Sequence, residues 1–419
     1  MSAETSMPDQ NTVLELRQRL KDIHNYVYAN DQIKQHPKVL AELLKLLLIK
    51  FYTETKSNVV WPTDAERLRE LFRSAILDLD LDDLFEKGES LELSPRVLSY
   101  AASQLSCIRL EGTDAKGAAF QTIVGPQVRG EKGQFFTPDP VRHLIVSVLD
   151  PQPTENMLDP ACGSGGLLVQ TIGHVEGRVR DQCEVASYCQ GHLFGIEIDP
   201  TIARLARLNM VLHGDGRSNI FCLDALRSLD AICAQTNGLI LADSMDVVAT
   251  NPPFGMRAKV DDPTVLRNFP NVAGSKMRQV PDILFLERIV QLLKPGGRAG
   301  IVVPIGDIAN SSLAYVREFL RSTCHIFATV SLPAPTFRPS ENSVNAAVLF
   351  VRKWPSKKRP ARYPTFRATS RRIGYDTHER PVYRKGENGT ASGVLDEDIS
   401  EIVSRWNDFR AKYGRKYLW

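Results

Sequence analysis

The chain has 419 residues, more than one hydrophobic core usually serves, so we expect more than one domain. Hydrophobic residues make up 43% of it, which is typical of packed globular domains and excludes a disordered chain. The formal net charge of +3 is small for this length, so any contact with a nucleic acid must depend on local basic patches.

Residues 1–125 have the pattern of an all-α domain. Apolar residues recur at helical spacing between residues 12 and 55, and this stretch contains the run Leu43 to Ile49. Such a continuous apolar run predicts burial on more than one side of the helix. Residues 64–110 continue in the same helical style.

Residues 126–354 have the alternation of strands and helices that is typical of a parallel α/β sheet. The predicted strands are 156–159, 193–198, 219–222, 245–250 and 298–303, followed by an antiparallel pair at about 326–332 and 346–352. Helices are predicted at 165–175, 200–213, 281–293 and 312–321. The fold class is therefore α/β, with a seven-stranded Rossmann-like sheet preceded by the all-α domain.

A glycine-rich segment links the first predicted strand to an apolar helix. Its sequence is Asp159-Pro160-Ala161-Cys162-Gly163-Ser164-Gly165-Gly166. Glycines there allow positive φ and a close approach of a ligand to the backbone, as in nucleotide-binding turns of doubly wound sheets. No Gly-Lys-Ser/Thr follows, so the segment is not a P-loop, and it lacks the Gly-x-Gly-x-x-Gly spacing of a dinucleotide site.

The second predicted strand ends in acidic residues, within Gly195-Ile196-Glu197-Ile198-Asp199-Pro200. A carboxylate at this position can accept hydrogen bonds from both hydroxyls of a ribose, and we assign that role to Glu197. Asp199, which precedes Pro200, is better placed to cap the next helix. The gap from Asp159 to Glu197 exceeds the usual ~20 residues. The excess lies in the polar stretch 176–191, an insertion or a longer helix and loop whose role, over 177–191, stays open.

The tetrapeptide Asn251-Pro252-Pro253-Phe254 follows an apolar strand. The side-chain oxygen of Asn251 and the backbone carbonyl of Pro252 can both accept hydrogen bonds from one planar amino group. The two prolines stiffen the loop, and Phe254 offers a surface on which a flat base or amide can stack. By itself the tetrapeptide fits a strand-terminating turn equally well, but its combination with the other motifs favours a binding site.

The end of the chain, residues 355–419, is expected to be a basic linker followed by an amphipathic helix. Residues 352–385 contain twelve Lys or Arg against two acidic residues, which suits either a solvated linker or a strip that contacts phosphates. Apolar residues at helical spacing over 395–417 predict a helix that docks on a partner or on the N-terminal helices.

Export, metal binding and membrane association are not expected. The residues Met1 to Ser6 are polar, unlike a signal peptide, and no apolar run reaches the ~18 residues of a membrane helix. The seven cysteines form no C-x-x-C pair, and the spacing of Cys183, Cys189 and His192 fits no standard zinc site. We therefore expect a soluble cytoplasmic protein with reduced thiols.

Taken in chain order, the motifs resemble the γ-class amino-methyltransferases of DNA, most closely the modification subunits of type I restriction–modification systems. The resemblance covers roughly residues 15 to 410. It is carried by Gly133-Gln134-Phe135-Phe136-Thr137-Pro138, Asp159 to Gly166, Gly195 to Pro200, Asp224, Asn251 to Phe254, Leu292 to Arg298, and Val344 to Val351.

The resemblance implies S-adenosylmethionine as the cofactor and assigns its contacts. Gly163, Ser164, Gly165 and Gly166 would line the methionine part, and Asp159 would orient this loop or contact the ammonium group. Glu197 would hold the ribose, and Asp224 would accept from the adenine amine. Ala161, Ile198 and Ala225 are also expected to contact the cofactor. The segment Gln134, Phe135, Phe136, Thr137, Pro138 and Asp139 would close over the cofactor, which Asn251 also touches.

The catalytic residues implied are Asn251, Pro252, Pro253 and Phe254, acting on an adenine flipped out of double-stranded DNA. Asn251 Oδ1 and the Pro252 carbonyl would localise the lone pair of the amine, and Phe254 would stack on the extruded ring. The long basic segment Gly255 to Val280 is expected to be mobile without DNA and to contact the substrate strand.

The residues after 352 are too few for a target-recognition domain, so the resemblance implies a separate specificity subunit, with two methyltransferase subunits for each specificity subunit. It allows a restriction/translocase subunit as a further partner. Two alternatives stay open. The chain could methylate a protein glutamine or an RNA amine, since such enzymes also carry Asn-Pro-Pro-aromatic, or it could be a non-enzymatic DNA-binding or assembly module.

Overall fold

The computed structural model describes residues 10–33, 36–56, 58–62, 64–110, 116–117, 119–120, 122, 137–179, 181–213, 219–254, 259–337, 345–355, 360, 362–376, 381–385 and 391–417. Internal contacts divide the chain into two compact units. One contains residues 1–132 and 207–216, and the other residues 133–206 and 217–419. Each unit is described separately below.

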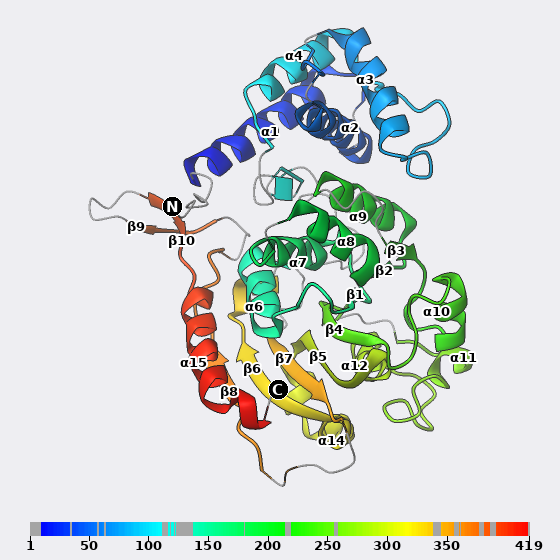
Figure 1. The fold of residues 1–419 in the computed structure, drawn as a ribbon, viewed down its shortest axis with the longest axis vertical. Helices are drawn as coiled ribbons and strands as arrows, with labels where there is room; N and C mark the ends of the chain where they lie inside the picture. Colours follow the sequence, from blue (N-terminus) through cyan, green and yellow to red (C-terminus); the bar gives the residue numbers. More distant parts are fainter. Residues whose placement is uncertain are drawn as a thin grey trace. The chain divides into compact units, whose positions relative to one another are not determined.

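The first unit contains four long helices, drawn in blue to cyan in Figure 1: α1 (Gln10–Asn30), α2 (His36–Thr55), α3 (Ala65–Asp78) and α4 (Pro95–Ser106). Helix α1 packs against α2 and α4, and α3 packs against α2 and α4. Leu46, Leu48 and Ile49 are fully buried, and every residue from Leu43 to Ile49 is buried. The predicted burial of α2 on more than one side is therefore confirmed.

The second unit is built on a sheet with the order β3-β2-β1-β4-β5-β7-β6-β8. The strands are β1 (Met157–Asp159), β2 (Leu193–Glu197), β3 (Asn219–Cys222), β4 (Met245–Thr250), β5 (Leu293–Pro304), β6 (Cys324–Ser331), β7 (Ala346–Lys353) and β8 (Phe366–Thr369). Strands β3 to β5 pair in parallel, whereas β7 runs antiparallel to both β5 and β6. All seven predicted strands are present, and the reversed pair is confirmed.

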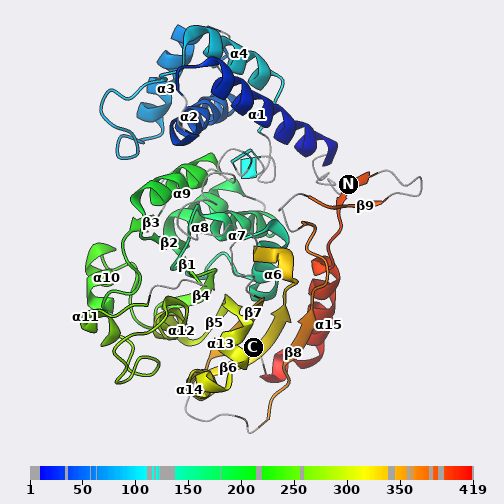
Figure 2. The same ribbon diagram turned by 180° about the vertical axis from the view of Figure 1, so that it is seen from behind.

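Helices cover both faces of this sheet (Figures 1 and 2). One face carries α6 (Asp139–Leu149), α7 (Gly166–Glu176), α8 (Gln182–His192) and α9 (Pro200–Leu212). The other carries α10 (Leu229–Gln235), α12 (Pro281–Leu292) and α14 (Ala314–Thr323), which share one hydrophobic core with β1, β4 and β5. Short elements are α11 (Pro263–Leu266), α13 (Ile305–Ala309), and the 3-10 turns η1 (Ser311–Leu313) and η2 (Ala334–Phe337).

The polar stretch between α7 and β2 is a helix rather than an open insertion. Asp181 caps α8 by accepting a hydrogen bond from the backbone N–H of Cys183 at 2.9 Å. Tyr188 and Cys189 are 1% exposed, so α8 is part of the packed unit. The extra length between Asp159 and Glu197 is thus accounted for by a second helix in the crossover.

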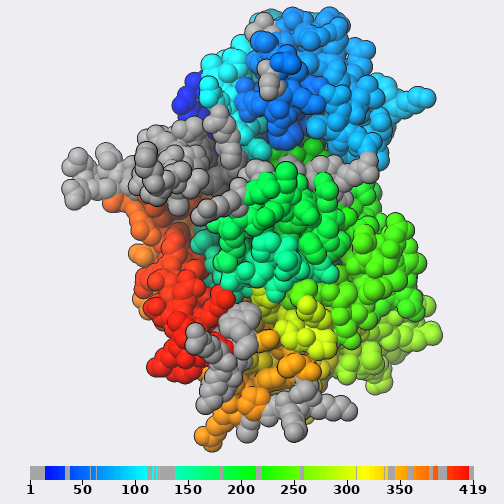
Figure 3. All heavy atoms as spheres, viewed as in Figure 1, coloured from blue at the N-terminus to red at the C-terminus, as the bar shows by residue number. Residues whose placement is uncertain are grey.

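The helix predicted over 395–417 is present, but part of the expected linker is a strand, and the helix packs within its own unit. Strand β8 pairs in parallel with β6 and extends the sheet to eight strands. Helix α15 (Ile399–Tyr417) packs on α6 and β8, and its Trp406 is fully buried, with ring centroids 5.6 Å from Phe327 and 5.7 Å from Phe366. The red atoms of α15 lie directly against the rest of the unit (Figure 3). Because α6 and β8 together supply an apolar surface for α15, the helix docks within its own unit.

A two-stranded hairpin, β9 (Tyr383–Lys385) and β10 (Ala391–Leu395), precedes α15. Among the described residues, no helix combines the length and apolar character needed to span a bilayer. The same residues contain no group of three or more His, Cys, Asp or Glu arranged to hold a metal ion.

Candidate functional site

Three of the motifs meet at the carboxyl edge of the sheet. Asp159 ends β1, Glu197 ends β2, and Asn251 follows β4, and these strands are adjacent and parallel. The strand order reverses between β1 and β4, because β1 is followed on one side by β2 and β3 and on the other by β4 and β5. Crevices at such switch points are where doubly wound sheets bind ligands.

The glycine-rich segment forms a tight turn into α7. Gly163 and Gly165 have φ values of +53° and +83°, in the left-handed region that L side chains rarely adopt. A Cβ atom on Gly163 would meet no atom within 4 Å, so open space borders the loop there. Gly166 differs from these two, since a Cβ atom on it would lie 2.8 Å from Arg142 Nη1 and the arginine side chain would have to move.

Glu197 ties the tip of β2 to this loop. Its Oε2 accepts a hydrogen bond from the backbone N–H of Gly163 at 3.0 Å, and its Oε1 accepts one from Asp199 N–H at 2.9 Å. The side chain is buried, and this burial raises its pKa. Each carboxylate oxygen retains lone-pair capacity beyond one backbone donor, so Glu197 can still accept from hydroxyl groups of a ligand.

Asp159 lies deeper than Glu197, with 1% of its surface exposed. Its Oδ1 accepts a hydrogen bond from the backbone N–H of Ala161 at 3.1 Å, which shapes the start of the loop. Burial raises the pKa of Asp159 to about 7, and the neighbouring Glu197 carboxylate adds to the rise. In this structure Asp159 orients the loop. Ser164, in the same loop, is also buried.

Residues after the β2 and β3 tips have both capping and surface roles. Asp199 Oδ1 accepts from the N–H groups of Thr201 and Ile202 at 2.9 and 3.3 Å, which confirms its assignment as a helix cap. Asp224 Oδ1 accepts from Leu226 N–H at 2.9 Å, next to the buried Ala225. Ile198 is 62% exposed, an apolar side chain left uncovered beside Glu197.

Asn251 is held by one hydrogen bond and has one unsatisfied atom. Its Nδ2 donates to Thr137 Oγ1 at 3.1 Å, which fixes the orientation of the amide. Its Oδ1 is buried and has no hydrogen-bond partner within the described part of the chain. A buried acceptor without a donor costs roughly 1–3 kcal/mol, so this arrangement is expected where a ligand supplies the donor.

The aromatic residue of the tetrapeptide, Phe254, contacts a second aromatic residue, Phe337. Phe254 packs edge-to-face on Phe337, with ring centroids 5.4 Å apart and an interplanar angle of 90°. The two side chains are 4% and 3% exposed, respectively, and Pro252 is also buried. Phe337 lies at the end of η2.

Only half of the predicted cofactor-covering segment can be placed. Gln134, Phe135 and Phe136 lie outside the described residues. Thr137 and Pro138 are half-buried and lead directly into α6, whose first residue is Asp139.

Arg142 braces this segment from within α6, a role that sequence reasoning missed. Arg142 forms an ion pair with Asp139, donates from Nη1 to the carbonyl of Thr137 at 3.2 Å, and lies against Gly166. It therefore joins the residue that holds Asn251 to the glycine-rich loop. A single arginine in a helix carries no sequence signal for such a role.

The described part of the long basic segment, residues 259–280, is packed rather than open, contrary to the expectation of a mobile loop. Val260 and Gln279 exchange backbone hydrogen bonds of 2.8 and 2.9 Å at its base. Phe269, Val272 and Ala273 are fully buried in the core that includes α12. The four basic residues of this segment are nevertheless exposed: Lys259, Arg267, Lys276 and Arg278.

The fold and the site together define the class of protein to which the chain belongs. A mostly parallel sheet with a reversed β7 between β5 and β6, a glycine-rich turn after β1 and an acidic tip on β2 make up the fold of S-adenosylmethionine-dependent methyltransferases. Residues 119–412 match the family model described as "N-6 DNA Methylase". The chain belongs to the N-6 DNA methylase family.

Two curated relatives show the closeness of the match. The type I restriction enzyme StySJI methylase subunit of Salmonella typhimurium is 30% identical over 344 residues, covering 74% of this chain and 62% of that one. The EcoKI methylase subunit of Escherichia coli K12 is 26% identical over the same shares of the two chains. The chain thus spans about three-fifths of the length of these relatives.

Solved structures share the fold. A type I restriction-modification system methyltransferase subunit from Streptococcus thermophilus aligns with a TM-score of 0.60 and 17% identity, covering 95% of this chain and 93% of that chain. A chain from a study of complex assembly in the type I restriction–modification system aligns with a TM-score of 0.62 and 23% identity, covering 98% and 85%. Both similarities extend over the helical unit and the sheet.

Proposed function

We propose that this chain is the methyltransferase subunit of a DNA-modifying assembly and transfers a methyl group to the exocyclic N6 amine of an adenine in double-stranded DNA. The observation that carries the proposal is the buried, unpartnered Oδ1 of Asn251, oriented by Thr137 at the tip of β4. Membership of the N-6 DNA methylase family supports the same chemistry.

The residues at the tips of β1 and β2 suit S-adenosylmethionine as the cofactor. Gly163 borders open space, Glu197 can accept from ribose hydroxyls, and the exposed Ile198 offers an apolar surface for a purine ring. Asp224 follows the next strand tip, where it would accept a hydrogen bond from the adenine amine of the cofactor. When bound, the cofactor supplies an electrophilic methyl group on a sulfonium.

Asn251 and Pro252 would act on the target amine. The lone pair of an exocyclic adenine amine is delocalised into the ring, so the free amine is a poor nucleophile. Two fixed acceptors, Asn251 Oδ1 and the carbonyl of Pro252, would draw both N–H bonds out of the ring plane and localise the lone pair on nitrogen. The hydrogen bond from Asn251 Nδ2 to Thr137 prepares this acceptor before the substrate arrives.

Phe254 and Phe337 would receive the extruded base. An adenine inside a duplex must leave the base stack to reach the tip of β4, at a cost of a few kcal/mol. Stacking on an aromatic ring offsets about 1–3 kcal/mol of that cost. The edge-to-face contact with Phe337 holds Phe254 in one orientation for this purpose.

Sequence choice would come from a separate specificity subunit, with two chains of this kind for each specificity subunit, and a restriction/translocase subunit would be a further partner. The relatives' names, which describe methylase subunits of type I restriction enzymes, support this assembly. The exposed cations Lys259, Arg267, Lys276 and Arg278 lie in the segment between β4 and α12, where they would contact DNA phosphates.

The experiment is methyl transfer by the complex that copurifies with this chain from its native host. Tritiated S-adenosylmethionine is supplied with double-stranded DNA, RNA and total protein in parallel. We expect label in DNA, recovered as N6-methyladenine after digestion. If the label appears only in glutamine side chains or in RNA, that molecule rather than DNA is the substrate. If calorimetry shows no binding of the cofactor, the chain is an assembly module and not an enzyme.

A further inference from the structure

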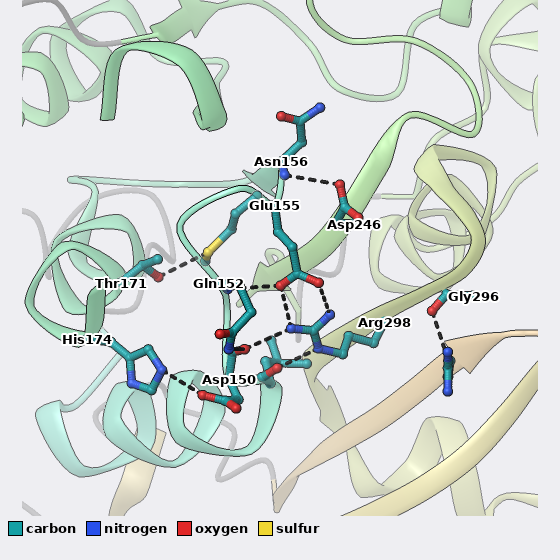
Figure 4. Close-up of polar contacts among 12 residues, drawn as sticks. Asp150, Gln152, Glu155, Asn156, Thr171, His174, Asp246, Gly296 and Arg298 are labelled. Atoms are coloured by element: carbon teal, nitrogen blue, oxygen red, sulfur yellow. Dashed lines mark hydrogen bonds and ion pairs between the residues drawn. The ribbon is translucent and has the colours of Figure 1, made fainter. Parts of the chain in front are cut away.

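A polar cavity lies at the opposite edge of the sheet from Asn251. It has a volume of about 540 Å³ and is bordered by the amino-terminal ends of β4 and β5, the end of α6, and α15. Figure 4 shows part of its wall, with Arg298 between Glu155 and the chain at Asp150. The residues that line it are Asp150, Gln152, Glu155, Arg178, Asp246, Lys294, Pro295, Gly296, Gly297, Arg298, Arg352 and Arg410.

Two arginines face each other across neighbouring strands in this wall. Arg298 of β5 and Arg352 of β7 are directly opposite in the antiparallel register, so their side chains leave the same face of the sheet. Like charges in this position are destabilising. Burial and the charge of Arg298 both lower the pKa of Arg352, which means that the protein environment disfavours its positive charge.

The carboxylates of the wall are used in fixing the cations. Glu155 binds Arg298 through both oxygens, at 2.8 and 2.7 Å, and Asp150 is shared by Arg178 and Arg410. Asp246 forms an ion pair with Lys294. Five cations and three carboxylates line the cavity, so it carries two positive charges in excess. A ligand that satisfies this excess must be an anion.

The residues of the wall indicate which class of anion the cavity can bind. None of the described residues that line the cavity is aromatic, so they offer no stacking surface for a base. Guanidinium groups present planar pairs of donors that match the oxygens of a phosphate. We propose that this cavity is a phosphate-binding site in which Arg352 binds the phosphate, with Lys294 at the rim. The buried Arg298, which Glu155 and the carbonyls of Leu149 and Asp150 hold in place, adds its positive charge from behind.

Occupancy would link elements that are far apart in the sequence. Arg298 and Arg352 come from the sheet, Arg178 follows α7, and Arg410 comes from α15. A phosphate here neutralises repulsion between β5 and β7 and joins the C-terminal helix to the sheet. The phosphate can belong to a small free molecule or to the backbone of a nucleic acid that reaches this edge.

The test uses the full-length chain and inorganic phosphate, with sodium chloride at matched ionic strength as the reference. We expect one calorimetric binding site and a phosphate-dependent rise in Tm. Arg352→Gln should weaken phosphate binding at least about tenfold. Lys294→Gln, at a position whose side chain is 45% exposed, should weaken it less without disturbing the fold. Arg405→Gln is the matched control, because Arg405 lies exposed on α15 and does not line the cavity.

A second arm separates the two sources of phosphate. If the site takes a nucleic-acid backbone, Arg352→Gln also weakens binding of a short DNA duplex, and inorganic phosphate competes with that duplex. If it takes a small molecule, duplex binding is the same in the variant and the parent. Absence of any phosphate response in the parent, or an equal response in folded Arg352→Gln, overturns the site. Because binding is measured rather than methyl transfer, failure here leaves the proposed function untouched.

Discussion

The two units treat buried polar groups in opposite ways. In the helical unit, Glu42 and Lys45 are almost fully buried and form an ion pair of 2.7 Å. Glu42 also accepts from the backbone N–H groups of Glu92 and Leu93, and Lys45 also donates to the carbonyl of Ser90. Both charges of this pair are matched by partners that hold the segment after α3 onto α2.

At the carboxyl edge of the sheet, the buried polar groups are incompletely matched. The Oδ1 of Asn251 has no partner among the described residues, and burial raises the pKa of both Asp159 and Glu197. The difference teaches which polar residues serve the fold and which serve a ligand. The satisfied pair of the helical unit suits a structural role, and the open acceptor of Asn251, at the same edge as the positive-φ glycines Gly163 and Gly165, suits a binding role.

The largest expected effect is the loss of activity in Asn251→Ala. Removing one of the two acceptors for the target amine should lower the rate of methyl transfer by at least about 10³-fold, as for other preorganised hydrogen-bonding groups. Affinity for S-adenosylmethionine should change little. Tritium transfer to DNA and calorimetry measure the two quantities, and a variant that keeps parental turnover would remove Asn251 from the mechanism.

The next largest effect is a loss of stability in Glu42→Leu. The change leaves the Lys45 ammonium and two backbone N–H groups buried without this acceptor, which should lower the free energy of unfolding of the helical unit by about 3–5 kcal/mol. The control is Glu70→Leu, which removes an ion pair with Arg67 whose side chains are 57% and 54% exposed. That change should cost under ~1 kcal/mol. Equal losses in urea titrations would contradict the distinction between buried and exposed pairs.

Asp159→Asn should change how stability depends on pH. The folded pKa of about 7 lies above the ordinary value of 3.8, so the folded state holds a proton that the unfolded state has lost between these pH values. Stability of the parent should therefore fall as pH rises from 3.8 to about 7. At pH 8 the variant should be more stable by up to about 4 kcal/mol, and near pH 3.5 the two should agree. A constant offset at every pH would show that the Asp159 proton is not the cause.

Glu197→Gln should weaken cofactor binding by roughly ten- to a hundredfold, since a neutral amide is a weaker acceptor for the two ribose hydroxyls than a carboxylate. Gln keeps the size of the side chain and one acceptor for the Gly163 N–H, so the loop should stay folded. Calorimetric titration with S-adenosylmethionine measures the change. Unaltered affinity would mean that Glu197 serves the loop alone.

The smallest effect is expected for Thr137→Val. Losing the hydrogen bond that orients the Asn251 amide should cost about 1 kcal/mol, or roughly fivefold in the rate of methyl transfer. Thr137→Ser keeps the hydroxyl and should restore the parental rate. If Val and Ser behave alike, the Thr137 contact does not prepare the acceptor.

Much of the second unit follows from local patterns. The strand that precedes Asn251 was predicted at its observed bounds, because a buried parallel strand is a short apolar run that Asn, Pro and Gly terminate. Strand β8 was missed, since Phe366 to Thr369 is too short and too polar to show a strand pattern. Its pairing with β6 depends on an exposed edge that only the folded sheet provides.

The site, too, was predictable in part from the sequence and in part depends on the tertiary structure. The sequence by itself determined the order of motifs and hence that Asp159, Glu197 and Asn251 would reach one edge, because parallel strands in a right-handed crossover pattern place their carboxyl ends together. Only the tertiary structure decided that Thr137 holds Asn251, that Phe337 supports Phe254, and that Arg298 faces Arg352. These contacts join residues 54 to 114 positions apart in the chain, and such side-chain pairings depend on packing and register rather than on local propensity.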